Sequence, residues 1–205
     1  MGDIILRLAL DLVMIEAREV FQIAKEYLNM YLISIYFDEK TNQTIQELVD
    51  KVAKKSGNSY MIETKVPPHI TIAAFESPRE DSIAEVIERL DHKVHEMKRG
   101  MLQWVSIGVF NPHVIFLSVV LSEYLHSLSV LVHETISSVD HVSMSRFYLP
   151  MQWMPHTTIA KKLSIEEMLL AFKTLQNNYK MFSGTVTRIG LAKTNPYEEI
   201  RVWDL

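Results

Sequence analysis

Hydrophobic residues recur along the chain with two periods, and the change of period separates helices from strands. Apolar residues three and four positions apart predict amphipathic helices at residues 42–55, 83–97, 123–138 and 165–178. Runs of β-branched and aromatic residues predict strands at residues 31–37, 102–110 and 114–121, with a final pair of strands closing the chain. Residues 140–154 fit neither period, and we expect an irregular loop or a bulged strand there.

The first 29 residues are predicted to form an additional amphipathic helix. Apolar residues between Asp3 and Asn29 again follow helical spacing, and charged residues interrupt them too often for a signal peptide. We therefore divide the chain into an N-terminal extension, residues 1–29, and one domain, residues 30–205. The extension either packs on the domain or joins two copies into a homodimer.

Two similar hexapeptides contain the side chains with the clearest chemical potential. The chain has Pro-His-Ile-Thr-Ile-Ala around His69 and Pro-His-Thr-Thr-Ile-Ala around His156. Each hexapeptide is rich in β-branched residues, and its proline keeps the preceding residue extended, so each is predicted to be a strand. Side chains alternate between the faces of a strand. His69 and Thr71 therefore share one face, as do His156 and Thr158, and the residues between them point to the core.

A larger unit surrounds each hexapeptide. Each is followed by a Ser-x-x-Glu sequence, beginning at Ser77 and at Ser164, which predicts a capping box at the start of a helix. A strand, an Asn-Pro turn and another strand come next in both copies. A repeated unit suggests two lobes related by a pseudo-two-fold axis. We expect a bilobal α+β fold in which two small, mostly antiparallel sheets line a central cleft and the helices lie outside.

The duplicated His-x-Thr pattern resembles the 2H phosphoesterase superfamily, which includes 2′-5′ RNA ligase-like proteins and cyclic nucleotide phosphodiesterases. The pattern of that family is His, an apolar residue, Thr or Ser, and an apolar residue, used twice. The first copy fits it fully, and the second has Thr157 at an apolar position. The resemblance extends in layout from Met30 to Leu205. It implies that His69 and His156 are catalytic and that Thr71 and Thr158 bind the substrate.

The chemistry of a cyclic phosphate explains why two histidines are useful. Opening the ring needs a base for water and an acid for the departing ribose oxygen, and histidine titrates near neutrality without special tuning. The two groups must lie on opposite sides of the phosphorus, which two opposed lobes would provide. Threonine hydroxyls can donate to the non-bridging oxygens. This scheme needs no metal and no cofactor, and the chain lacks the His-Glu-x-x-His pattern of zinc enzymes.

Four further residues are candidates for binding the substrate. Trp153 could stack on a nucleobase, although aromatic residues are more often part of a core. Lys161 follows the second motif and could supply positive charge. His113 and Tyr197 occupy matching places after the two Asn-Pro turns and could line the cleft.

Composition narrows the classes of function. The 205 residues have a formal net charge of −4, so bulk charge does not favour binding to long nucleic acids, whereas one locally positive cleft could hold a small phosphate ester. There is no cysteine, which excludes disulfides, thiolate zinc sites and cysteine nucleophiles. A cytoplasmic protein is consistent with this composition, and no apolar run is long enough for a membrane span.

Three functions are compatible with these features. The resemblance favours a metal-independent phosphodiesterase acting on a nucleotide 2′,3′-cyclic phosphate or a 2′-5′ linkage, with a nucleotide or an RNA end as its partner. The alternative is a non-catalytic module that binds a nucleotide or an RNA end with the same fold. A third hypothesis is an assembly factor that works through the N-terminal helix.

Overall fold

The computed structural model describes residues 29–110, 112–194 and 196–205. The predicted extension lies outside the described residues except for Asn29, which begins the first strand. Both its packing and its role in a homodimer therefore remain predictions.

The described chain alternates strands with helices, mostly where the sequence predicts them. The strands are β1 (Asn29–Phe37), β2 (Ile70–Ser77), β3 (Gly100–Phe110), β4 (Val114–Val119), β5 (Ser143–Met144), β6 (His156–Lys161), β7 (Phe182–Lys193) and β8 (Glu198–Asp204). The helices are α2 (Glu39–Ser56), α3 (Tyr60–Glu63), α4 (Glu80–Lys93), α5 (Glu123–Ile136) and α6 (Ile165–Asn178), with 3-10 turns η1 (Val94–Glu96) and η2 (Arg146–Tyr148). The short α3 was not predicted, and β5 and η2 account for the uncertain segment 140–154.

All strand pairs are antiparallel and form one continuous sheet in the order β5-β2-β1-β7-β3-β4-β6, with β8 beside β7. The α+β class and the antiparallel strands are confirmed, whereas the two separate sheets that we expected are joined. The reason is the length of β7: its first half pairs with β3 and its second half with β1. Val186 lies at the junction and pairs with both Phe37 and Gly100.

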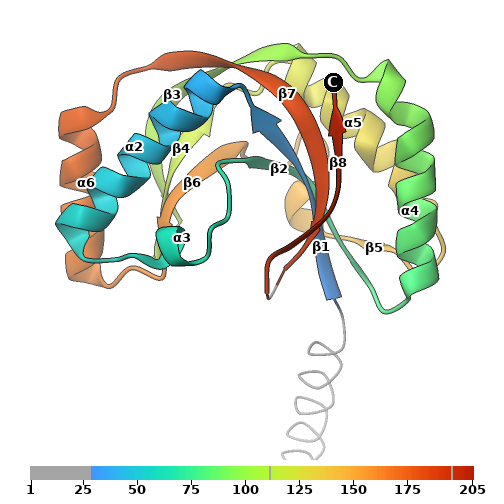
Figure 1. Ribbon diagram of the computed structural model, residues 1–205, viewed down its shortest axis with the longest axis horizontal. Helices are drawn as coiled ribbons and strands as arrows, with labels where there is room; N and C mark the ends of the chain where they lie inside the picture. Colours follow the sequence, from blue (N-terminus) through green and yellow to red (C-terminus); the bar gives the residue numbers. More distant parts are fainter. Residues whose placement is uncertain (1–28, 111, 195) are drawn as a thin grey trace, which may run out of the picture.

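The duplicated halves exchange helices across this junction. The first half runs β1-α2-β2-α4-β3, and the second runs β4-α5-β6-α6-β7. Helix α2 of the first half packs against α6 of the second, and α4 packs against α5. Figure 1 shows the two helix pairs on opposite sides of the molecule with the curved sheet between them. We call the side covered by α2 and α6 lobe II and the side covered by α4 and α5 lobe I.

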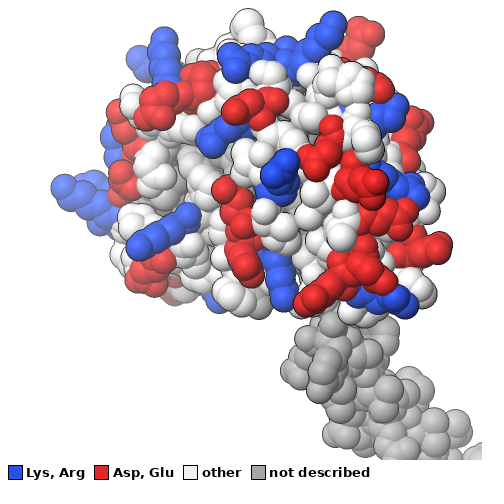
Figure 2. Space-filling model, turned by 45° about the vertical axis from the view of Figure 1, so that its right-hand side comes forward, with Lys and Arg blue, Asp and Glu red and all other residues white. Residues whose placement is uncertain are grey.

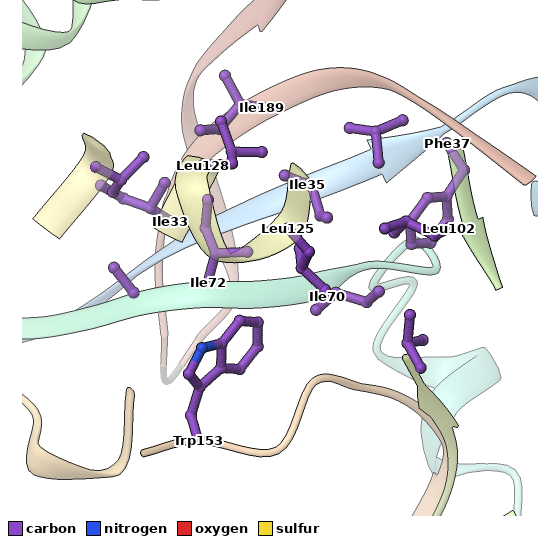
Figure 3. Packing of buried hydrophobic residues seen from close by; sticks show 14 of the residues in the cluster. Ile33, Ile35, Phe37, Ile70, Ile72, Leu102, Leu125, Leu128, Trp153 and Ile189 are labelled. Carbon is purple, nitrogen blue, oxygen red and sulfur yellow. The ribbon is translucent and has the colours of Figure 1, made fainter. Parts of the chain in front are cut away.

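The core contains the residues of the motif strands that were predicted to point inward. Ile70, Ile72 and Ile159 have no exposed surface, and they belong to the main hydrophobic cluster. Figure 3 shows Ile70 and Ile72 of β2 beside Ile33 and Ile35 of β1 within this cluster.

One of the two predicted capping boxes is present. The Ser164 hydroxyl accepts a hydrogen bond from the Glu167 amide, and the Glu167 carboxylate accepts one from the Ser164 amide. The box predicted at Ser77 is wrong: Ser77 is the buried last residue of β2, where it pairs with Asn29, and α4 begins only at Glu80. Ser77 therefore belongs to strand β2, although the sequence pattern assigned it to the start of the helix.

Replacing Ser164 with alanine removes one acceptor of this box and should lower the free energy of unfolding by about 1 kcal/mol. Urea denaturation monitored by circular dichroism measures the change. Ser183→Ala, at an exposed position of β7, is the control and should change stability by less than about 0.5 kcal/mol. Equal effects of the two substitutions would contradict the capping role.

Candidate active site

One cavity of about 350 Å³ lies between the two motif strands. All four residues of the duplicated motif line it, which is the arrangement that the repeated unit predicted. The remaining wall comes from β1, from the segment around α3, from η2, and from the end of β7 and the turn after it. The lining residues are Leu32, Tyr60, Met61, Thr64, Val66, His69, Thr71, Tyr148, His156, Thr158, Lys161, Thr194, Pro196 and Tyr197.

A bulge at the same place in both motif strands shapes the cavity. Thr71 pairs with Ser34 and Ala73 with Ile33, so Ile72 is an extra residue in β2. In the second copy, Thr158 and Ala160 pair with adjacent residues of β4, which makes Ile159 the extra residue in β6. A bulge changes which face the following side chains occupy.

The second bulge is what brings Lys161 into the cavity. Strict alternation would place Lys161 on the core side with Thr157 and Ile159. The extra residue reverses the alternation, so both Ile159 and Ala160 are buried and Lys161 lines the cavity instead. The equivalent residue of the first copy is Ala74, which is fully buried. Only the second copy therefore directs a cation to the site.

Both motif histidines are held in the same tautomer by the same kind of hydrogen bond. Nδ1 of His69 lies 2.8 Å from the carbonyl oxygen of Pro67, and Nδ1 of His156 lies 2.8 Å from that of Met154. A carbonyl can only accept, so each Nδ1 carries the proton and donates. In the neutral ring Nε2 is then the basic nitrogen, and it is free to exchange a proton with a bound molecule.

The surroundings favour the neutral form of both rings. Burial lowers the pKa of His69; the hydrogen bond to Pro67 opposes this, and the charges of His156 and Lys161 lower the pKa further. Burial also lowers the pKa of His156, against the effect of its hydrogen bond to Met154. The charge of His156 thus acts on the His69 imidazole across the cavity.

Hydroxyl groups surround the first motif. The Thr71 hydroxyl lies 3.3 Å from that of Ser34, and Tyr148 lines the cavity together with Thr71. The Tyr197 hydroxyl lies 3.1 Å from that of Tyr36, whose ring centroid is 6.5 Å from that of His69. Burial raises the pKa of Tyr36, so this phenol stays protonated at neutral pH.

Aromatic rings surround the second motif instead. The ring centroid of His156 lies 4.9 Å from that of Phe110, in an edge-on arrangement, and 5.1 Å from that of Phe116. The two phenylalanines stack on each other with their centroids 4.3 Å apart. The duplicated histidines thus keep the same backbone setting in two chemically different environments.

The cavity is suited to an anion. Lys161 is its one Lys or Arg lining residue in the described chain, and the described lining contains no carboxylate. In the described ranges no group of three or more His, Asp or Glu side chains is arranged to hold a metal ion. Among the same residues no helix is both long enough and apolar enough to cross a membrane.

Two of the predicted substrate-binding residues lie elsewhere. Trp153 is 8% exposed and packs in the hydrophobic cluster, where Figure 3 shows its indole directed toward Ile70 and Ile72. The Trp153 ring, which we considered for stacking on a nucleobase, is thus part of the hydrophobic core. Tyr148 is the aromatic residue of this segment that lines the cavity. His113 also lies outside the cavity, because its Nδ1 bonds to the Leu163 carbonyl 2.8 Å away. Tyr197 and Lys161 do line the cavity.

No pattern in the sequence indicated the part of the wall that the α3 segment forms. Tyr60, Met61, Thr64 and Val66 reach the cavity from the connection between α2 and β2. The helix has only four residues, too few to show a period, so no hydrophobic pattern could have identified it. The prolines at 67 and 68 indicated only where this connection ends.

The lowered pKa values predict that stability decreases as the pH falls. Unfolded histidines bind protons below about pH 6.5, whereas the folded rings resist protonation, so the unfolded state binds more protons there and is favoured. Each histidine can contribute at most about 1.4 kcal/mol per pH unit in this window. A double variant, His69→Asn with His156→Asn, should lose less stability between pH 7.5 and 5.5, as measured by urea unfolding.

Asparagine suits this experiment because its amide can still donate to the backbone carbonyl that accepts from Nδ1. His95→Asn is the matched control, because that side chain is 73% exposed and lies away from the cavity. The same dependence on pH in the double variant and in the unmodified protein would contradict the proton linkage.

Comparison with known proteins places this geometry in a family. A model of the 2′-5′ RNA ligase superfamily matches residues 37–198. No curated protein sequence matches the chain. Among solved structures, Escherichia coli LigT complexed with 3′-AMP is 12% identical with a TM-score of 0.53, and the match covers 87% of this chain and 98% of LigT. The protein TT0787 of Thermus thermophilus is also 12% identical, with a TM-score of 0.58 and coverage of 86% and 97%. The matched region includes both His-x-Thr motifs, and the chain belongs to the 2′-5′ RNA ligase superfamily of 2H phosphoesterases.

Proposed function

We propose that the protein is a metal-independent phosphodiesterase that acts on a nucleotide 2′,3′-cyclic phosphate or a 2′-5′ linkage. The observation that carries this proposal is the pair of histidines in one cavity, each with Nδ1 fixed by a backbone carbonyl and Nε2 free for proton transfer. A module that only bound phosphate would not need two titratable groups held in this matching way.

The proposed reaction is hydrolysis with balanced proton transfers. One imidazole removes a proton from water as the water oxygen bonds to phosphorus. The bond between phosphorus and one ribose oxygen breaks, and the second imidazole, initially protonated, gives its proton to that oxygen. The product is a phosphate monoester with a free hydroxyl, and the histidines end in exchanged protonation states.

Three further residues stabilise the charge that develops on the phosphate. Thr71 and Thr158 are placed to donate to the non-bridging oxygens, and Lys161 supplies the positive charge of the site. The hydrogen bond between the hydroxyls of Thr71 and Ser34 restricts the rotation of Thr71, so its hydroxyl is oriented before the substrate binds.

A nucleotide substrate fits the mixed chemistry of the wall. Tyr60, Met61 and Val66 offer apolar surface, while Tyr197 offers a hydroxyl group. LigT has been crystallised with 3′-AMP, with ATP and with NADP+, which supports a nucleotide as the ligand of this fold. A decisive first assay incubates the purified protein, in EDTA, with 2′,3′-cyclic nucleotides, 2′-5′ dinucleotides and cyclic-phosphate RNA ends, and resolves the products by mass.

Substituting the motif residues should separate catalysis from binding. His69→Ala and His156→Ala should each lower kcat by about two to four orders of magnitude, the usual contribution of a positioned acid or base. Thr71→Val and Thr158→Val should cost at most about two to three orders, since each removes one donor. The double His variant should be little worse than either single variant, because both groups act in one step. Near-normal turnover by either single His variant would favour the non-catalytic binding module.

The dependence of the rate on pH should be bell-shaped, because one histidine must be neutral and the other protonated. Both pKa values are lowered in the free protein, so we expect kcat/KM to be greatest on the acidic side of about pH 6.5. A bound phosphate anion favours both imidazolium forms, so the optimum of kcat should lie at higher pH. Initial rates measured from pH 4.5 to 9 test whether the optimum of kcat lies at a higher pH than the optimum of kcat/KM. A kcat optimum at a lower pH than the kcat/KM optimum would contradict this expectation.

A further inference from the structure

We propose that helix α6 of lobe II is the contact surface of a homodimer, in which α6 packs antiparallel against α6 of a second copy of this chain. The described lining of the cavity includes no residue of α6, so this surface is separate from the candidate active site. The inference therefore does not depend on the proposed function. The observations that carry it are a stripe of exposed apolar side chains and the two charges beside that stripe.

Three large apolar side chains form a stripe along the outer face of α6. Ile165, Leu169 and Phe172 are 71%, 67% and 44% exposed, and their spacing of four and then three residues places them one above another on the helix. The face turned to the core carries Ala171 and Leu175, which are fully buried. Figure 1 shows α6 at the left margin of the molecule, with α2 and the sheet on its inner side. The described residues therefore leave the stripe in contact with solvent.

The equivalent helix of the other half has no such stripe. Helix α4 follows the first motif strand as α6 follows the second, and its exposed residues are Glu80, Asp81, Ala84, Glu88, Asp91 and His92. Figure 2 shows Lys, Arg, Asp and Glu side chains spread over the face that is turned forward there, on the side of α4. Among the four long helices that the structure describes, α6 alone exposes large apolar residues. An exposed apolar patch of this kind marks a contact surface.

The charges beside the stripe favour a second copy of this chain as the partner. Glu166 and Lys173 are seven residues apart, so they lie on the same flank of the stripe, one toward each end. Neither forms an ion pair within 4.0 Å with another described residue. Two copies of α6 that pack antiparallel about a two-fold axis beside Leu169 bring Ile165 of each copy against Phe172 of the other. The same register brings Glu166 of each copy against Lys173 of the other.

The same charges disfavour a parallel pair of helices. With both copies of α6 running in the same direction, Glu166 would lie level with Glu166 and Lys173 level with Lys173, so like charges would repel. The size of the contact sets the expected strength of the antiparallel pair. Helix α6 has 14 residues and is about 21 Å long, so a contact along it alone is smaller than the standard interface of about 800 Å² per partner. We therefore expect a reversible dimer with a Kd of about 1–100 µM.

Exchanging the two charges tests the pairing. Glu166→Lys or Lys173→Glu alone turns both attractive pairs into repulsive ones and should raise the Kd about 5- to 50-fold at low salt. The double variant restores opposite charges, so its Kd should lie within about threefold of that of the unmodified protein. An equimolar mixture of the two single variants should form a heterodimer of similar strength, because each copy then meets the opposite charge on the other. Sedimentation velocity of the full chain from about 1 to 200 µM measures each Kd.

A substitution within the stripe tests the apolar contact. Leu169→Lys places two lysines beside the two-fold axis, at the centre of the contact, and should raise the Kd at least about 30-fold. Ile62→Lys is the matched control, because that side chain is 45% exposed and belongs to α3. It should change the Kd by less than about twofold, the range expected of a surface substitution outside the contact. Thermal unfolding of every variant checks that it is folded.

Cross-linking tests the antiparallel register. The chain has no cysteine, so Leu169→Cys introduces a single thiol beside the axis, and mild oxidation should join two copies through a disulfide. Ile62→Cys should form no disulfide under the same conditions. A dimer without a disulfide in the Leu169→Cys variant would overturn the register.

Two further outcomes would overturn the dimer through α6. One is a full chain that stays monomeric up to about 200 µM, well above the expected Kd. The other is a dimer whose Kd is unchanged by the single charge variants or by Leu169→Lys. Such a dimer is held by another surface, for example by the extension of residues 1–29.

Discussion

The antiparallel ladder between β3 and β7 is the constraint on which the rest of the molecule depends. Val186 pairs with Gly100 on one side and with Phe37 as β7 continues beside β1, so one strand fixes both halves. Helix α2 crosses near this junction, where a side chain on Gly184 would lie 2.1 Å from the Thr41 hydroxyl. Since the halves also exchange helices, each helix pair combines one helix from each half of the sequence. The two motif strands, β2 and β6, therefore lie toward opposite edges of one continuous sheet.

Within this sheet, the two copies of the motif hold two titratable imidazoles in the same way, by local backbone geometry alone. In both copies the histidine donates from Nδ1 to the carbonyl two residues before it, and in both a bulge follows the threonine. These features need no contact between the lobes, because each uses only its own strand and the neighbouring one. What the lobes add is the cavity, in which burial lowers the pKa of both imidazoles.

The differences between the copies decide what the site can bind and how each histidine behaves. The first motif lies among hydroxyl groups of Ser34, Tyr148 and Tyr197, and the second among the rings of Phe110 and Phe116. The residue at the matching place after the bulge is the fully buried Ala74 in the first copy and Lys161, which lines the cavity, in the second. Two copies with the same local backbone thus place their histidines in different surroundings, which suits the proposed reaction, in which one group takes a proton while the other gives one.

The sequence by itself determined the longer strands and helices and the four motif residues, because local hydrophobic periods and a repeated His-x-Thr pattern specify them without distant contacts. Only the tertiary structure decided that the strands form one sheet, that Ser77 ends a strand instead of capping a helix, and that Trp153 is buried while Tyr60 reaches the cavity. These outcomes depend on pairing between segments far apart in the chain. The inward position of Lys161 depends in the same way on the register of β6 against β4, which no local pattern reveals.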